Sequence, residues 1–487
     1  MIGRLGPVAG ECGPRPPAPL RSAPVAFRAA RCGEYAPTWS QRYYLAEMAQ
    51  AARSGRSLAL RRCYELNPDV TEARLVDAVR VLVETFESLR SRMNSTDADA
   101  RMRSYAEGTL HIAVYEAPTR SPNHIDRFTE ELAVSMAAEP FDARAEWPVR
   151  AAVVLNPFGP RFLILVLSHT AVDAFATPPI ADLLTRLGMT GESGAADESN
   201  AASIETRGPR EVAEWEQSAA GARRGARALA QAAEVYERMP AAPRPGAAAP
   251  CRELLSWTSP ALDMAVAFIS SRTGMTGSTV LTAAAMAVDA SWSEERFAFR
   301  QLLSANRTRT GTTSAVVPLS QPVPCLVDTD GASFGQLLER TGTAMLKALR
   351  GGGYPPEQMT RLQETVARRR GVSIDCSPTL NYRPHQAFTV PSGSEPGEDL
   401  APLMSRSRAE WVDGALRWTS THYLSADVYA SGTRFLLQVD TRLWDRAGAD
   451  DWMAALERLL VEAAAGDLDH ARWRSLAGRK PVETGRA

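Results

Sequence analysis

The sequence lacks the features that mark several large classes of protein. Its longest apolar strand-like run, Phe162 to Leu167, is far shorter than the ~20 residues that a membrane-spanning helix needs. Prolines and arginines interrupt the chain from Pro7 to Arg31, so we do not expect a secretion signal there. The formal net charge is only −1, so no overall field would attract nucleic acid or an anionic membrane.

Motifs for metal, phosphate and serine-hydrolase chemistry are also missing. No CxxC pair exists among the six widely spaced cysteines, so neither a zinc site nor a disulfide framework is predicted. We expect reduced thiols and a cytoplasmic location. The chain has no GxSxG, GxGxxG or GxxxxGK[ST] sequence. These absences argue against a nucleophile elbow, a dinucleotide fold and a phosphate-binding loop.

What remains is an ordinary globular composition in a long chain. Of the 487 residues, 45% are hydrophobic and 23% are charged, which predicts two or three domains of usual size. Composition breaks suggest the boundaries. We expect a disordered tail over 1–33, an N-terminal lobe over 34–190, a linker with a connecting helix over 191–250, a C-terminal lobe over 251–475, and a disordered tail over 476–487.

Helix and strand patterns alternate in both lobes, which predicts an α/β fold. In the segment from Thr71 to Phe86, apolar residues repeat at helical spacing. The run from Arg161 to Leu167 is typical of a buried strand, and a helix is expected to start near Thr177 or Pro178. The connecting helix is predicted over Arg210 to Arg238.

One histidine has a partner at a useful spacing, namely His169 with Asp173 four residues later. His169 follows a buried strand directly, and such strand ends often present side chains to a cleft. Histidine is also the natural proton acceptor near neutral pH. A structural alternative stays open, in which His169 caps the strand and Asp173 starts the next helix.

The sequence around His169 resembles the HHxxxDG core motif of nonribosomal peptide synthetase condensation domains. This superfamily includes chloramphenicol acetyltransferase and the plant HxxxD acyltransferases. Further segments resemble family motifs in the same order, over about residues 35–465. They are Pro37-Thr-Trp-Ser-Gln-Arg-Tyr-Tyr-Leu45, Glu87-Ser-Leu-Arg90, Pro140-Phe-Asp142, Pro148-Val-Arg150, Ser304-Ala-Asn-Arg307 and Pro378-Thr-Leu-Asn381.

The resemblance implies two chloramphenicol acetyltransferase-like lobes that meet in a V, with an active-site tunnel between them. It assigns His169 as the catalytic residue and Asp173 as a structural residue paired with an arginine, for which Arg307 is the best candidate. Ser168 would support the active site, and Asn381 and Gln321 are possible tunnel-lining residues. Neither a metal nor another cofactor is expected.

Three positions depart from the family pattern. Ser168 replaces the first histidine of the motif, and Ala174 replaces its closing glycine. The segment from Val317 to Gln321 lacks the glycine and asparagine of the usual Gly-x-x-x-Asn pattern. Active relatives with only HxxxD exist, so these departures bear on catalysis more than on the fold.

The leading hypothesis is a free-standing acyltransferase that joins a thioester-bound acyl or aminoacyl donor to an amine. The donor would be carried on the phosphopantetheine of a carrier protein acting in trans, or on coenzyme A. One alternative is a catalytically degenerate platform that binds other enzymes, and another is ester formation on a hydroxyl acceptor. We expect a monomer with no nucleic acid or membrane partner.

Overall fold

The computed structural model describes residues 16–53, 55–94, 100–118, 121–191, 207–243, 251–309, 311–384, 400, 402–414, 420–429 and 432–478. The chain forms two compact units. The first comprises Met1–Ala226, Ala305–Gln321 and Gly353–Pro356. The second comprises Arg227–Ser304, Pro322–Gly352 and Glu357–Ala487. Residues 305–321, which we expected in the C-terminal lobe, therefore belong with the unit that carries His169.

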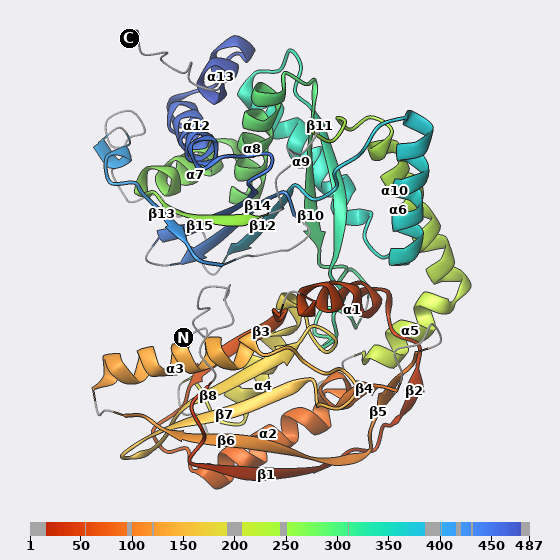
Figure 1. Ribbon diagram of the computed structural model, residues 1–487, viewed down its shortest axis with the longest axis vertical. Coiled ribbons are helices and arrows are strands. Elements are labelled where there is room, and N and C mark those ends of the chain that lie inside the picture. Colours follow the sequence, from red (N-terminus) through yellow and green to blue (C-terminus); the bar gives the residue numbers. More distant parts are fainter. Residues whose placement is uncertain are drawn as a thin grey trace. The chain divides into compact units, whose positions relative to one another are not determined.

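The first unit is built on a five-stranded sheet with the order β1-β6-β7-β8-β3 (Figure 1). Strands β6 and β7 run parallel, and the other neighbouring pairs are antiparallel. The strands are β1 (Arg21–Arg28), β3 (Ala59–Glu65), β6 (Glu107–Glu116), β7 (Val149–Asn156) and β8 (Gly159–Ser168). A second, small sheet joins β2 (Gly33–Tyr35), β5 (Met102–Ser104) and β4 (Ser91–Met93).

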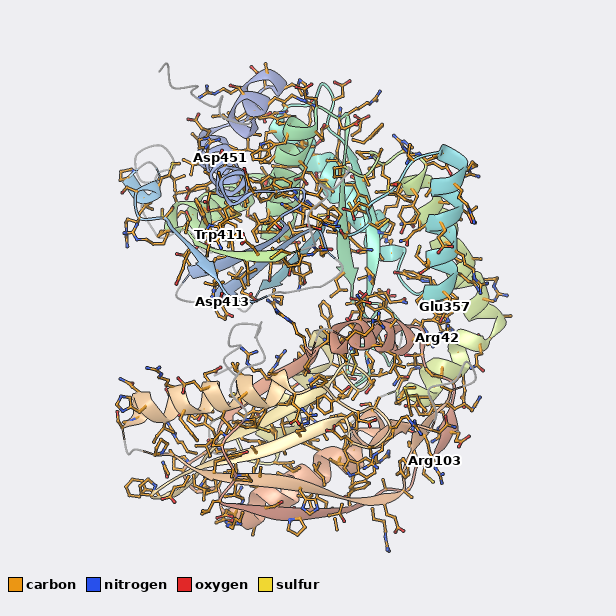
Figure 2. All side chains as sticks on the ribbon, viewed as in Figure 1. Arg42, Arg103, Glu357, Trp411, Asp413 and Asp451 are labelled. Carbon is orange, nitrogen blue, oxygen red and sulfur yellow. The ribbon has the colours of Figure 1, made fainter. Side chains whose placement is uncertain are left out.

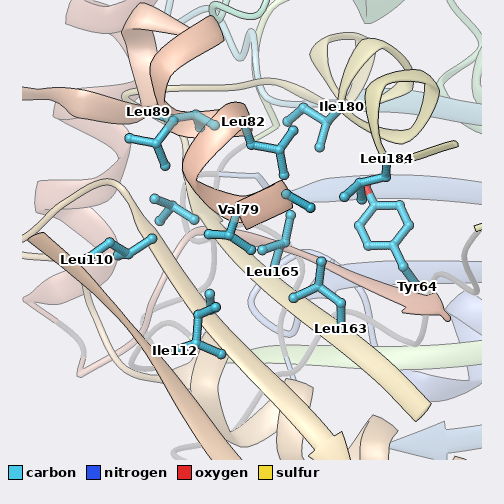
Figure 3. Close-up of a cluster of buried hydrophobic side chains, with 14 of the residues drawn as sticks. Tyr64, Val79, Leu82, Leu89, Leu110, Ile112, Leu163, Leu165, Ile180 and Leu184 are labelled. Carbon is cyan, nitrogen blue, oxygen red and sulfur yellow. The ribbon is translucent and has the colours of Figure 1, made fainter. Parts of the chain in front are cut away.

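Helices cover both faces of the large sheet, and this explains the unbroken apolar sequence of β8. Successive side chains of a strand point to opposite faces. Leu163 and Leu165 therefore join the core under α2 (Glu72–Thr85) and α4 (Pro178–Arg186), as Figure 3 shows. Ile164 and Val166 pack on the other face, against α3 (Pro122–Ala138). The predicted buried strand ending at the HxxxD motif is confirmed.

The N-terminal tail predicted over 1–33 is wrong for its described part. Residues Arg21–Arg28 form β1, which pairs with β6 along its whole length. Val25 and Phe27 are buried in the α2 core, and Phe27 also meets the ring of Trp147 edge-on. The high proline and arginine content hid an alternation of exposed and buried residues that a strand at a sheet edge tolerates. Residues 1–15 lie outside the described part of the chain.

The connecting segment also differs from its prediction. Instead of one helix over Arg210 to Arg238, two helices form, α5 (Pro209–Gln217) and α6 (Ala219–Tyr236). The break lies at Ser218, whose backbone is extended and whose hydroxyl donates to the carbonyl of Trp215. A serine side chain that bonds local backbone groups commonly ends or starts a helix in this way.

The second unit holds a seven-stranded sheet with the order β11-β10-β12-β14-β15-β9-β13. Helix α8 is rich in alanine and is buried along nearly its whole length, because short side chains let α7, α9, α12 and α13 approach it closely. The helices are α7 (Pro260–Thr273), α8 (Gly277–Ser293), α9 (Phe334–Arg350), α10 (Pro356–Arg370), α12 (Arg446–Ala465) and α13 (His470–Ala477), and the strands are β9 (Arg252–Thr258), β10 (Phe297–Ser304), β11 (Gln321–Asp328), β12 (Thr379–Pro384), β13 (Arg408–Val412), β14 (His422–Tyr429) and β15 (Gly432–Asp440).

The C-terminal tail predicted from residue 476 begins later than expected. Leu476 and Ala477 are the last residues of α13, and Ala477 is fully buried. Residues 479–487 lie outside the described part. Within the ranges that the structure describes, no helix is both long and apolar enough to cross a bilayer.

Candidate active site

The site begins where β8 ends. The carbonyl of Ser168 accepts backbone hydrogen bonds from Ala171 and Val172, at 3.0 and 3.2 Å. This closes a tight turn directly after the strand. Ala171 and Val172 are fully buried in the core beside α2, so the packing of these two side chains holds the turn in place. His169 is therefore carried by a turn that is fixed at both of its ends.

The imidazole of His169 is held in one tautomer. Its Nδ1 lies 2.9 Å from the carbonyl oxygen of Val172. A carbonyl can only accept, so Nδ1 carries the proton and Nε2 keeps a lone pair. The residue is 9% exposed, and burial lowers the pKa of His169. The Val172 carbonyl therefore fixes the tautomer, and the lowered pKa keeps the His169 ring neutral at neutral pH.

Asp173 and Arg307 form the predicted ion pair. Nη2 of Arg307 lies 2.8 Å from Oδ1 of Asp173, and the carboxylate is only 1% exposed. Its other oxygen, Oδ2, accepts the backbone N–H groups of Leu319 and Ser320, both at 2.8 Å. A buried carboxylate needs such partners to offset its lost hydration. Asp173 thus joins the His169 turn to the segment 305–321.

Arg307 organises that segment around itself. Its guanidinium donates to the carbonyls of Thr312, Ala315 and Val317 at 3.0, 2.7 and 3.0 Å. The preceding residue, Asn306, has a φ of 53°, a left-handed conformation that asparagine adopts more readily than most residues. The Asn-Arg pair therefore turns the chain and then fixes the turn.

The two departures within the core motif have different outcomes. The hydroxyl of Ser168 accepts from the backbone N–H of Thr170 at 3.2 Å and lies 2.9 Å from the Thr170 hydroxyl, so it stabilises the turn. Ala174 opens the short 3-10 helix η2 (Ala174–Ala176). Among the described residues, only Glu294 and Asn306 have a positive φ without being glycine, so Ala174 causes no backbone strain.

The side chains of the two possible tunnel-lining residues are used in other contacts. Gln321 is 1% exposed, and its amide bonds the backbone of Gly353 and Tyr354. Its side chain is thus used to hold a loop. Asn381 belongs to the second unit, where its amide donates to the hydroxyl of Tyr423 at 3.0 Å. A place for Asn381 in a tunnel stays a prediction.

Helix α1 (Trp39–Ala52) supplies contacts to His169 that the sequence did not reveal. The ring of Tyr44 stacks on the imidazole, with centroids 4.3 Å apart and planes 7° from parallel. Gln41 donates its amide to the carbonyl of Thr170 at 2.8 Å. Both residues lie in the segment resembling the family's opening motif, and that resemblance is the signal that could have identified them.

The start of α1 is fixed by a capping box and by the partly buried carboxyl group of Glu216. Thr38 and Gln41 bond each other's backbone N–H groups. The N–H of Trp39 donates to Oε2 of Glu216 at 2.7 Å. Burial raises the pKa of Glu216 to about 8, opposed in part by the charge of Arg42, which is labelled on α1 in Figure 2. These contacts set where α1 places Tyr44.

Comparison with solved structures defines the class of fold. The SgcC5 protein from Streptomyces globisporus is 17% identical with a TM-score of 0.64, and the match covers 88% of this chain and 98% of that one. A doubly substituted starter condensation domain of rhizomide synthetase in complex with C8-CoA is 14% identical, with a TM-score of 0.61 and coverage of 90% and 96%. A third solved chain comes from work on condensation domain-mediated chain release from the enacyloxin polyketide synthase. It is 17% identical with a TM-score of 0.63, and the match covers 100% of this chain and 87% of that one.

These matches establish the fold of condensation domains, with two chloramphenicol acetyltransferase-like lobes. The sequence model of the condensation domain matches residues 32–472. The chain therefore belongs to the condensation-domain family, which serves natural-product synthesis. No curated protein matches the sequence.

Proposed function

We propose that this protein is a free-standing condensation-type acyltransferase that uses His169 to join a thioester-bound acyl or aminoacyl group to an amine. The observation that carries this proposal is the tautomer of His169, whose Nδ1–H bonds the carbonyl of Val172 at 2.9 Å. That bond leaves the Nε2 lone pair for a substrate. Within the described part of the chain, no hydrogen bond is made to Nε2 of His169.

The chemistry follows from this protonation state. The acceptor nitrogen attacks the thioester carbonyl carbon, a carbon–nitrogen bond forms, and the carbon–sulfur bond breaks. Nε2 of His169 takes the proton that the nitrogen loses, and the resulting imidazolium gives this proton to the leaving thiolate, which restores neutral His169. Because burial lowers the pKa of His169, the ring stays neutral and competent as a base across the physiological range.

Asp173 has a structural role in this scheme. Both carboxylate oxygens are used, one by Arg307 and the other by the backbone of Leu319 and Ser320. The charge of Asp173 also raises the pKa of His169 against the larger effect of burial. It therefore holds the turn and favours the protonated intermediate without touching the substrate.

The solved relatives support the proposed donor. The rhizomide starter domain is in complex with C8-CoA, which is a coenzyme A derivative. We extend this to a thioester on coenzyme A or on the phosphopantetheine of a carrier protein. A second candidate, ester formation, has its own support: SgcC5 was solved with (R)-(-)-1-(2-naphthyl)-1,2-ethanediol, a ligand with two hydroxyl groups.

A carrier-protein transfer assay with mass-spectrometric detection tests the proposal. Acyl-loaded carrier proteins and acyl-CoA thioesters are each offered with amine and with hydroxyl acceptors. We expect an amide product that His169→Ala lowers by about 10²–10⁴-fold, the usual contribution of a general base. The matched control is His111→Ala, since His111 lies exposed on β6 of the same unit.

The same experiment separates the remaining alternatives. An ester product would establish the hydroxyl acceptor instead. A platform without catalysis would bind its partner enzymes equally well before and after His169→Ala, and it would form no product with any donor. Full activity in the His169→Ala protein would end the catalytic assignment.

A further inference from the structure

Tyr44 makes two contacts in the first unit that a packing residue alone would not need. Its ring lies parallel to that of His169, at a centroid distance of 4.3 Å and an angle of 7°. Its hydroxyl lies 2.7 Å from Oγ of Ser320. Tyr44 is buried, so these contacts form in a region of low polarity where both are stronger than in water.

The partner of the Tyr44 hydroxyl is itself fixed by the HxxxD loop. The backbone N–H of Ser320 donates to Oδ2 of Asp173 at 2.8 Å. Asp173 directly follows the turn that carries His169, so a path of neighbouring groups runs from His169 through Asp173, Ser320 and Tyr44 back to His169. Gln41, one turn earlier on α1, ties the same helix to the carbonyl of Thr170. The plane of the Tyr44 ring is therefore set from several sides.

An aromatic face at this position matters when the imidazole is charged. Burial disfavours the imidazolium ion, and the ring's Nδ1 partner is a neutral carbonyl. Among the described residues, the charged groups that act on His169 are Asp173 in its own loop, which raises its pKa, and Arg62 on β3, which lowers it. The hydrogen bond to the Val172 carbonyl also raises the pKa of His169. The facing ring on α1 is a further group that can stabilise positive charge, through its π electrons.

We propose that Tyr44 is a positioning residue for His169, whose ring fixes the imidazole plane and stabilises the imidazolium that forms when the acceptor loses its proton. The inference rests on the proposed function, because it assigns Tyr44 a part in proton uptake by His169. The hydroxyl only holds the ring in place, through Ser320. The ring and the hydroxyl therefore have separable roles.

Two kinds of substitution separate these roles from simple packing. Tyr44→Phe keeps the aromatic face and removes the hydroxyl. Tyr44→Leu and Tyr44→Met keep an apolar side chain and remove the face. If Tyr44 acted only by excluding water, the smaller side chains would admit water and raise the pKa of His169. If the ring stabilises the cation, losing it lowers that pKa.

The deciding measurement is an NMR titration of the full chain with labelled histidine, with the His169 signal assigned from the His169→Ala spectrum. We expect the pKa of His169 to fall by roughly 0.4–1.5 in Tyr44→Leu and Tyr44→Met, the range that a cation–π contact supplies. Tyr44→Phe should stay close to the unsubstituted protein. Tyr105→Leu, a change of the same kind elsewhere in the first unit, is the matched control. An unchanged or raised pKa in both non-aromatic variants overturns the proposal.

Activity provides the second reading and separates failure of this inference from failure of the proposed function. The midpoint of the acidic limb of the rate–pH profile should move with the NMR pKa of His169, because the base is lost on protonation. We expect kcat to change and KM to stay nearly constant, and Tyr44→Leu should add nothing in a His169→Ala background. If the chain forms no product under any condition, the proposed function fails while the titration still decides whether Tyr44 stabilises the charged ring. Loss of folding in one non-aromatic variant leaves the other, together with Tyr44→Phe, to decide the question.

Discussion

Among the described residues, each unit contains one buried histidine, and the two differ in the direction of a single hydrogen bond. In the first unit, Nδ1 of His169 donates to the carbonyl of Val172. In the second, Nη1 of Arg300 donates to Nδ1 of His422 at 2.7 Å, because a guanidinium has no acceptor. The proton of His422 therefore lies on Nε2, whereas that of His169 lies on Nδ1.

The surroundings of the two histidines differ as well. His422 lies between Trp444 and Trp452, at centroid distances of 4.9 and 4.8 Å, and its Nε2 is a buried atom without a hydrogen-bond partner among the described residues. Arg300 is fully buried and pairs with Asp289 at 2.6 Å. His169 instead lies on a turn at a strand end. Burial lowers the pKa of both histidines, so a low pKa does not by itself identify a base.

The strongest test of this contrast replaces each histidine by alanine. His169→Ala should lower turnover by about 10²–10⁴-fold while the melting temperature changes little. His422→Ala should lower the free energy of unfolding by about 3 kcal/mol, because it opens a cavity beside two tryptophans and removes the acceptor of Nη1 of the buried Arg300. Transfer assays and urea unfolding measure both. If His422→Ala abolishes turnover in a protein that remains folded, the assignment of His422 as a purely structural residue is wrong.

Two aspartate–arginine pairs with buried guanidinium groups, one in each unit, provide the next comparison. Asp173→Asn and Asp289→Asn should each cost about 3 kcal/mol of stability, since each weakens the partner of a buried guanidinium. Only Asp173→Asn should also lower turnover, by roughly tenfold or more, because its carboxylate holds the His169 turn. The exposed pair of Asp69 and Arg74 is the control, and Asp69→Asn should cost less than about 1 kcal/mol. Equal losses of activity in both buried variants would contradict the assignment.

The low pKa of His422 predicts how stability depends on pH. Because this pKa is lower in the folded than in the unfolded protein, the unfolded chain binds more protons below about pH 6.5, the unperturbed histidine value. Stability is therefore fully present above that pH and falls, by at most about 1.4 kcal/mol per pH unit for this group, as the pH drops toward the folded-state pKa. His422→Phe cannot take up a proton. Urea unfolding from pH 7.5 to 5 should show that the difference in free energy of unfolding between the unsubstituted protein and His422→Phe becomes smaller. A difference that grows as the pH falls would contradict a lowered pKa of His422 in the folded protein.

The smallest effect is expected at the departure from the family motif. Ser168 bonds Thr170 within the turn, so Ser168→Ala should cost about 1 kcal/mol of stability. Turnover should stay within about threefold, because the hydroxyl is used by the turn. Parallel kinetics and melting curves check this. A loss as large as that of His169→Ala would give Ser168 a direct part in the reaction.

Much of the fold around the site could be predicted from local pattern. The apolar run before His169 forms β8, and the helical spacing from Thr71 to Phe86 forms α2. The strand β1 was missed because prolines and arginines surround the two buried residues, Val25 and Phe27, that fix it. Pairing with β6, about 80 residues away, supplies the hydrogen bonds that make this segment a strand, and such a partner leaves no local signal.

The sequence by itself determined the family, the position of His169 after a buried strand, and, by resemblance, the pairing of Asp173 with Arg307, which lie 134 positions apart. Tertiary structure alone decided which nitrogen of each buried histidine carries the proton. It also placed Tyr44 against His169 and grouped residues 305–321 with the first unit. The reason is physical: a strand or helix follows from the spacing of nearby side chains, whereas a tautomer depends on whether a donor or an acceptor meets the ring. His169 meets a carbonyl and His422 meets a guanidinium, and neither partner is fixed by the motif around the histidine.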